Sequence, residues 1–183
     1  TFGLDPDIFV IGKCVAGGLP TALWGLRPDL ATRFATYNAT RPPGHSGMGT
    51  TLSANPLQFA ALLATLTQVA TPTALAKMER GAQRLATGLS CAIAAHGAPW
   101  HVVRVGARVE FICAPGPLRN GFEAARAHAP EVEAVTHLAL LNRGSLIAPF
   151  HNMMLVSPVT TRAQIDRLVA NFHAVLGMLF SKD

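Results

Sequence analysis

The apolar residues near the start of the chain form an unbroken run. Ile8-Phe9-Val10-Ile11 are β-branched or aromatic and lack polar alternation. Such a run predicts a strand buried on both faces, as in a parallel sheet. A second short strand is expected at 21–25. Arg27-Pro28-Asp29 then opens a short helix over 30–34, with its proline near the first turn.

The pattern next predicts a loop, a helix and a break. Residues 36–50 are rich in threonine, proline and glycine and show no apolar period, which predicts a long loop. A long apolar helix is expected from Pro56 to Val69. Thr71-Pro72-Thr73 interrupts it, and we place a domain boundary near residue 72. The predicted domains are 1–72 and 73–183.

The remaining sequence alternates between helical and strand-like spacing. Apolar residues recur at helical intervals from Ala74 to His96, which predicts one amphipathic helix. Residues 100–105 and 108–113 alternate as half-buried strands do. A final amphipathic helix is expected over 161–180, capped by a threonine. The shorter elements between them are helices at 122–128 and 131–142 and strands at 145–148 and 153–156. The second half is thus a small α+β unit.

Composition excludes several classes of protein. Half of the 183 residues are hydrophobic and only 14% are charged, which indicates a globular chain with part of its surface covered by a partner. The net charge of +5 comes without a basic cluster and favours weak attraction for anions over nucleic-acid binding. No apolar run is long enough to span a membrane.

Cysteines and histidines give no metal site. The three cysteines are far apart and form no CxxC, which favours a reduced, cytoplasmic setting. The seven histidines show no metal-ligand spacing, so no metal is expected. The chain also begins without methionine, a few residues before a buried-type strand, and we therefore expect it to be part of a longer protein.

Lys13 is the residue with the strongest chemical signal. It follows the first apolar run and is the one lysine with apolar and glycine neighbours, the others being Lys77 and Lys182. A lysine held out of water becomes nucleophilic, as a Schiff base with an aldehyde cofactor requires. The alternative is a strand-end lysine that reaches solvent. A phosphate-binding P-loop is excluded, because Asp7 occupies its first glycine position and Cys14 follows the lysine.

Other candidate residues are weaker. Hydroxyl groups before the helix at Pro56 could bind an anion, although these residues alone favour ordinary capping by Ser53 or Asn55. Three arginines could bind a substrate carboxylate or form salt bridges: Arg104, Arg108 and Arg143. Four loop residues could approach a substrate or be ordinary loop residues: His45, Phe150, His151 and Asn152.

Two motifs together resemble one enzyme family. The chain resembles class III pyridoxal-phosphate-dependent aminotransferases, closest to the glutamate-1-semialdehyde aminomutase-like branch. The lysine segment of that family is matched by Pro6-Asp7-Ile8 through Gly12-Lys13, by Gly17-Gly18-Leu19-Pro20 and by Trp24-Gly25. Its threonine-bearing phosphate loop is matched by Gly49-Thr50-Thr51-Leu52-Ser53-Ala54-Asn55-Pro56. Two later segments agree with the small domain, namely 106–111 and 144–149.

The resemblance implies a fold and a chemistry. The fold is α/β: the carboxyl-terminal part of a fold-type I pyridoxal-phosphate-dependent transferase, with the end of the large domain and a small α+β domain. Lys13 becomes the catalytic Schiff-base lysine, and Thr51 a ligand of the cofactor phosphate in the other subunit. The expected protein is a cytoplasmic homodimer with shared sites, with a small-molecule amino donor and keto acceptor, and without nucleic-acid or membrane partners.

The expected reaction is amino-group transfer. An intramolecular aminomutase of the glutamate-1-semialdehyde type is the alternative. In the family, an acidic residue that pairs with the pyridine nitrogen lies further upstream of the lysine than Asp5 and Asp7. The chain alone is therefore expected to be an incomplete enzyme. A non-catalytic truncated remnant and a generic anion-binding module remain as alternatives from other classes.

Overall fold

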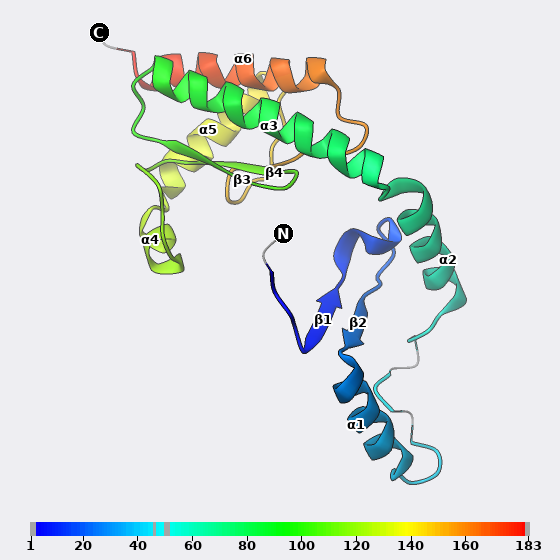
Figure 1. Cartoon of the computed structure of the whole chain (residues 1–183). Helices are drawn as coiled ribbons and strands as arrows, with labels where there is room; N and C mark the ends of the chain where they lie inside the picture. Colours follow the sequence, from blue (N-terminus) through cyan, green and yellow to red (C-terminus); the bar gives the residue numbers. More distant parts are fainter. Residues whose placement is uncertain (1–2, 46, 50–51, 182–183) are drawn as a thin grey trace. The chain divides into compact units, whose positions relative to one another are not determined.

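The computed structural model describes residues 3–45, 47–49 and 52–181 (Figure 1). The chain divides into two compact units, unit 1 (Thr1–Thr71) and unit 2 (Pro72–Asp183). This division falls beside the break that the sequence predicts near residue 72. The interpretation of the units as a cofactor-binding domain and a small domain stays a prediction.

Unit 1 begins with an antiparallel strand pair. Ile8 lies opposite Leu26, and Ile11 lies opposite Leu23. The prediction of a parallel-type strand buried on both faces is wrong for this chain, because all four side chains of the first strand are exposed. Within the described residues the ribbon has two strands only, and Phe34 of α1 contacts Trp24 of its second strand. The elements of unit 1 are β1 (Ile8–Ile11), η1 (Lys13–Ala16), β2 (Leu23–Leu26), α1 (Pro28–Ala39), α2 (Pro56–Ala64) and η2 (Thr65–Val69).

Helix α1 is longer than the short helix predicted at 30–34. The hydroxyls of Thr32 and Thr36 donate to the carbonyls of Pro28 and Thr32, at 3.0 and 2.9 Å. Threonine can satisfy its hydroxyl in this way inside a helix. The polar composition that indicated a loop from residue 36 onward is therefore compatible with helix as far as Ala39.

The predicted helix from Pro56 to Val69 is confirmed, with a change of type. It is an α-helix as far as Ala64 and a π-helical turn from Thr65 to Val69. The turn is closed by Ala70 N–H, which donates to the carbonyl of Thr65 at 2.8 Å. The side chain of Asn55 caps the helix by accepting from Leu57 N–H at 2.9 Å, so ordinary capping is confirmed here.

Unit 2 is built on a three-stranded antiparallel sheet with the order β3-β4-β5. The predicted strands at 100–105 and 108–113 are confirmed with slightly different ends. They are joined by Gly106-Ala107, where Gly106 has φ +56. The elements of unit 2 are α3 (Pro72–Ala95), β3 (His101–Val105), β4 (Arg108–Ile112), α4 (Gly121–Arg126), α5 (Pro130–Asn142), β5 (Met153–Leu155) and α6 (Arg162–Leu179).

The strand predicted at 145–148 is absent from the described structure. The backbone N–H of Ser145 donates instead to Leu140 O, which finishes α5, and its hydroxyl accepts from Asn171 at 2.8 Å. Ala148 N–H donates to Met153 O at 3.1 Å, a single bond where a ladder would need several. The segment is therefore held by α5 and α6, and its hydrogen-bonding groups are not free to form a strand.

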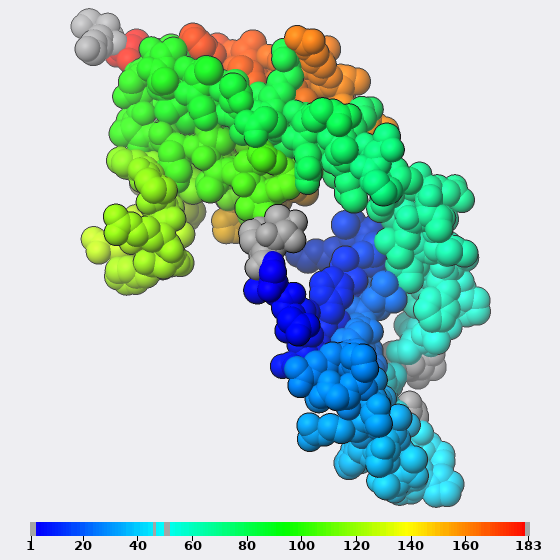
Figure 2. Space-filling model, in the orientation of Figure 1, coloured from blue at the N-terminus to red at the C-terminus, as the bar shows by residue number. Residues whose placement is uncertain are grey.

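Helices α3 and α6 pack at very short distance because glycines face the contact. A Cβ added to Gly88 would lie 2.6 Å from a methyl of Val169, and one added to Gly81 would lie 2.9 Å from Val156. In Figure 2 the green atoms of α3 lie directly against the orange and red atoms of α6. The core of unit 2 collects residues from both helices and from the sheet: Leu85, Leu89, Val109, Phe111, Leu140, Phe172 and Leu176.

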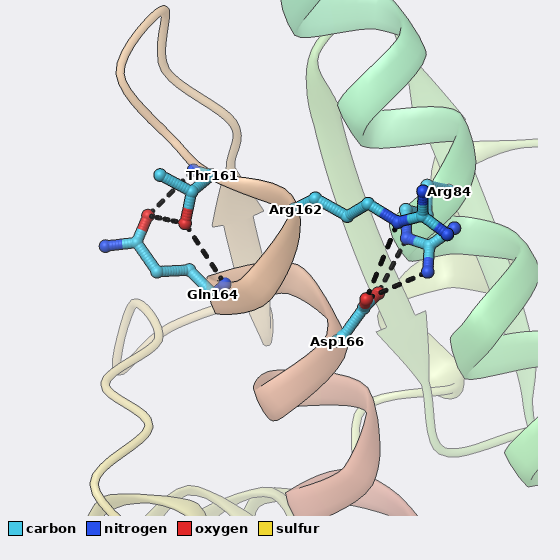
Figure 3. Close-up of polar contacts among 5 residues, drawn as sticks. All are labelled: Arg84, Thr161, Arg162, Gln164 and Asp166. Atoms are coloured by element: carbon cyan, nitrogen blue, oxygen red, sulfur yellow. Dashed lines mark hydrogen bonds and ion pairs between the residues drawn. The ribbon is translucent and has the colours of Figure 1, made fainter.

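An ion pair joins the same two helices at the surface (Figure 3). Arg84 on α3 contacts both carboxylate oxygens of Asp166 on α6, at 2.6 and 2.9 Å. Arg162 lies 3.8 Å from the same carboxylate. At the start of α6, Thr161 and Gln164 form a reciprocal capping box. The hydrogen bond from Arg84, followed by the charges of Arg84 and Arg162, lowers the pKa of Asp166.

No single helix among the described residues is long and apolar enough to cross a membrane. Only α2 with η2 and α3, counted together across a sharp bend, meet the length and composition that a membrane span needs. In α3 the apolar side chains of Leu85, Leu89 and Ile93 are buried in unit 2.

Substitution of Asp166 should make unit 2 less stable at neutral pH and should have little effect on its stability at acid pH. Because the pKa of Asp166 is lowered in the folded state, its contribution is present above the unfolded pKa and is lost as the pH falls through the folded pKa. Asp166→Asn should thus lower the melting temperature at pH 7 and change it little at pH 2. Thermal melts at both pH values measure this. Glu79→Gln, which removes an exposed carboxylate of α3, is the control. An equal loss for Asp166→Asn at both pH values would contradict the prediction.

Cys113 should react far more slowly with thiol reagents than the other cysteines. Burial, aided by the charge of Glu133, raises the pKa of its thiol to about 12. Cys14 and Cys91 are exposed. Because the thiolate is the reacting species, iodoacetamide at pH 8 should label Cys113 at least about tenfold more slowly than Cys91. Peptide mass mapping over time measures the rates, and equal rates in the folded protein would contradict the assignment.

Candidate functional site

Lys13 lies where β1 ends and the one-turn helix η1 begins. Its backbone has φ +62, a left-handed conformation that costs energy for a residue with a side chain. The residue is exposed, which agrees with the alternative of a strand-end lysine that reaches solvent and not with a lysine held out of water. No described residue forms a hydrogen bond or ion pair with its amine. The structure thus leaves the amine of Lys13 open to a ligand.

The turn that carries Lys13 is anchored on helix α2. Val15 and Ala16 are 5% and 2% exposed and pack against Leu62, whereas Lys13 itself stays at the surface. Gly17 closes the turn in the left-handed region, and its N–H donates to Cys14 O at 3.1 Å. The side chain of Gln58 donates to Pro20 O at 2.8 Å and ties the following segment to the same helix. Lys13 is therefore exposed on a turn whose backbone is held against helix α2.

Asp7 is occupied by a different partner. Its carboxylate pairs with Arg27 at 2.6 Å, and Arg27 N–H donates to the carbonyl of Asp7. Arg27 also pairs with Asp29 at the start of α1. These contacts fasten the end of β2 to the start of β1. They agree with the prediction that Asp7 is not the acidic partner of a pyridine nitrogen.

Thr51, the predicted phosphate ligand, lies outside the described residues. Downstream of it, Ala54 has φ +58 and Asn55 caps α2. A cavity of about 440 Å³ lies beside this segment. Its walls come from 20–24 and 52–54, together with Met48, Gln58 and Phe59. An open space therefore adjoins the start of α2, whereas the anion that the sequence suggests there stays a prediction.

The three arginines considered for carboxylate binding already have partners within unit 2. Arg104 donates to Gly106 O at 2.8 Å, and Arg108 pairs with Glu110. Arg143 donates to Ala139 O at 3.1 Å. The alternative that they serve local structure is the one the contacts favour.

The four candidate loop residues divide between the two units. In unit 1, His45 contacts Arg41 and accepts from Gly47 N–H at 2.9 Å. In unit 2, Phe150 is exposed, while His151 and Asn152 have φ +57 and +46. Asn152 is 5% exposed and donates to Phe111 O, which indicates a structural role in closing the turn.

The structure also groups residues that the sequence did not single out. His151 and Asn152 line a cavity of about 110 Å³ together with Glu110, His128 and Glu133. Glu133 pairs with His128 at 3.0 Å and accepts from Ala129 N–H. No group of three or more possible ligands within the described part of the chain could hold a metal ion. The residues come from separate segments, so no spacing motif could have revealed the cluster.

Comparison with known proteins identifies the family. The model of the family described as aminotransferase class-III matches residues 1–176. A glutamate-1-semialdehyde 2,1-aminomutase from Desulforudis audaxviator is 32% identical over 98% of this chain and 40% of its own length. The chain thus spans about 40% of the length of the curated relatives that it matches. The part of the relatives to which it corresponds stays a prediction.

Solved structures give the same picture. A glutamate-1-semialdehyde aminomutase variant from Pseudomonas aeruginosa, in complex with PMP, has a TM-score of 0.91 and 41% identity over 97% of this chain and 40% of its own. A β-phenylalanine aminotransferase from Variovorax paradoxus has a TM-score of 0.80 and 29% identity, covering 96% of this chain and 39% of its own. The chain therefore belongs to the class III aminotransferases, a family of enzymes that depend on pyridoxal phosphate.

Proposed function

We propose that the amine of Lys13 binds pyridoxal phosphate covalently and that the protein transfers an amino group between an amino acid or amine and a keto or aldehyde acceptor. The observation that carries this proposal is the exposed amine of Lys13, which stands without a described partner on an anchored turn. Family membership and the PMP complex of a similar protein support the same cofactor.

The residues present fit this cofactor. The unprotonated form of an amine attacks an aldehyde, and a carboxylate partner would favour the protonated form; no described carboxylate contacts Lys13. In the segment after the turn, a Cβ built on Gly18 would meet no atom within 4 Å. When bound, the cofactor supplies an aldehyde that links to amines and a ring that withdraws electrons from the neighbouring carbon.

Lys13 has two tasks in the proposed reaction. Its Nζ first holds the cofactor in place through a covalent bond. With a substrate in place of the lysine on the cofactor, Nζ would be a free base close to the reacting carbon. It would then take the proton from the substrate carbon and deliver it to the cofactor carbon that had carried the aldehyde. Both tasks require one side chain in one place, which a turn anchored by Val15 and Ala16 provides.

An intramolecular aminomutase is the second candidate. It is supported by the higher identity to glutamate-1-semialdehyde aminomutases, 41% against 29% for the β-phenylalanine aminotransferase. An aminomutase returns nitrogen to the same molecule, whereas an aminotransferase passes it to another. Nitrogen-15 in the substrate amine distinguishes them, because only the aminotransferase passes label to an added keto acid.

We also propose a homodimer that shares its cofactor sites, with Thr51 of each subunit serving the cofactor on Lys13 of the other. The proposal is supported by the family resemblance and by apolar side chains that lie open in unit 1. Ile8, Phe9 and Val10 are exposed by 56%, 57% and 67%. Covering this apolar surface with a partner subunit would be favourable, because it would remove these side chains from water.

Borohydride reduction of the full-length protein with pyridoxal phosphate should leave a phosphopyridoxyl group on Lys13. Peptide mass mapping locates the label, because the reduced linkage is stable to digestion. Lys13→Arg should abolish the label and the turnover of amino donors, since the guanidinium is not a nucleophile at neutral pH.

Lys77→Arg is the matched control for this experiment. The amine of Lys77 donates to Pro158 O at 2.8 Å, and its substitution should leave labelling at Lys13 unchanged. Scattered labelling, or none, in the full-length protein would refute the assignment of Lys13 and favour a non-catalytic remnant.

Mixing two inactive variants should restore activity if the sites are shared. Lys13→Ala lacks the amine but keeps Thr51, and Thr51→Val keeps the amine but lacks the hydroxyl. A mixed dimer then contains one site in which both residues are intact. Activity measured after subunit exchange should rise above that of either variant alone. Persistent inactivity, with exchange verified by mass spectrometry, would show that each site is built within one subunit.

A further inference from the structure

Thr65 lies next to the turn of residues 13–17, which carries Lys13. It follows α2 directly, one turn after Ala61 and Leu62, the residues on which Val15 and Ala16 pack. Side chains at this spacing share one face of a helix. The face that anchors the turn therefore continues through Thr65, the first residue of the π-helical turn η2.

The hydroxyl oxygen of Thr65 lies against Gly17. A Cβ built on Gly17 would approach that oxygen to 3.2 Å, which is closer than nearly all real contacts of this kind. Threonine is branched at Cβ and rotates little about χ1, so the oxygen cannot easily move away. A side chain at position 17 would thus meet both the cost of φ +63 and the oxygen of Thr65, so the side chain of Thr65 fills the space beside Gly17.

The contact is transmitted to Lys13 through a short piece of backbone. The N–H of Gly17 donates to Cys14 O, so a shift of Gly17 moves the residue next to Lys13. The left-handed conformation of Lys13 costs energy and persists only where the surroundings enforce it. If the turn loosens, Lys13 can relax toward negative φ, and its side chain then points elsewhere.

We propose that Thr65 is a positioning residue for Lys13: its side chain, packed against Gly17, holds the 13–17 turn and so directs the amine of Lys13. This inference rests on the proposed role of Lys13 in binding pyridoxal phosphate. Thr65 does not act on the cofactor in this proposal. It acts through Gly17 and the backbone of the turn.

Three variants of the full-length protein test the proposal. Thr65→Ala removes the contact, and Thr65→Val keeps the branched shape without the hydroxyl group. Thr67→Ala is the matched control, because Thr67 lies in the same π-helical turn, is exposed, and donates only to Leu63 O. Circular dichroism melts verify that all three variants fold.

The first measurement is capture of pyridoxal phosphate by the cofactor-free protein, followed by visible absorbance over a range of cofactor concentrations. Thr65→Ala should lower the limiting rate of capture by about tenfold, because misdirected groups lose rate steeply. The half-saturating concentration should change little. Thr65→Val should retain most of the native rate, and Thr67→Ala all of it.

The second measurement needs no cofactor. Trypsin cleaves after lysine, and the bond between Lys13 and Cys14 lies inside the turn. Cleavage there requires local opening. Thr65→Ala should accelerate it relative to Thr67→Ala, with cleavage after Arg104 in unit 2 as the internal reference.

The outcomes separate the two proposals. If the native protein fails to capture the cofactor at Lys13, the proposed function is wrong and this inference is refuted with it. If Lys13 captures it but Thr65→Ala behaves as Thr67→Ala does, only the role of Thr65 is refuted. Faster cleavage without slower capture also refutes it, since Thr65 would then support the turn without directing the amine.

Discussion

Close contact between α3 and α6 is the constraint on which unit 2 depends. Gly81 and Gly88 leave no room for a side chain, because the side chains of Ile165 and Val169 on α6 lie directly against them. The other apolar residues of the two helices are thereby directed at the sheet. There the ring centroids of Phe111 and Phe172 lie 4.8 Å apart. The bidentate pair of Arg84 and Asp166 lies at the solvent edge of this contact. It fixes the register of two helices whose packing would otherwise depend on shape alone.

Unit 1 buries far fewer apolar residues than unit 2 does. Its buried apolar cluster consists of Val15, Ala16 and Leu62, and most apolar side chains of β1 remain exposed. What the small cluster holds is the turn around Lys13, the most strained segment near the proposed chemistry. A strained backbone conformation persists only where the surrounding structure enforces it. At Lys13 that surrounding structure is one face of α2. Unit 1 thus concentrates its order at the lysine.

Local patterns predicted most elements, because helix spacing and strand alternation are properties of the neighbouring sequence. The helix at Pro56 and the hairpin at Gly106 are examples. Predictions failed where other partners compete for the same groups. Ser145 satisfies its backbone on α5, and threonine hydroxyls bonded to carbonyls extend α1. Lys13 could be singled out by its neighbours, whereas the local pattern left both its burial and its exposure open, since burial depends on layers that the sequence does not reveal. The contact of Gly17 with Thr65 joins distant segments and has no local signature.

The direction of α6 relative to α3 has a consequence in time. Gly81 meets Ile165, Gly88 meets Val169, and Gly177 meets His96, so the two helices run parallel. The first helix of unit 2 therefore finds its main partner only after residues 162–179 have left the ribosome. Until then the apolar face of α3 has no helix to cover it, and such surface invites association with other chains. Unit 2 therefore cannot complete its folding until nearly all of it has been synthesised. During that interval the apolar face of α3 is a surface that a chaperone can bind.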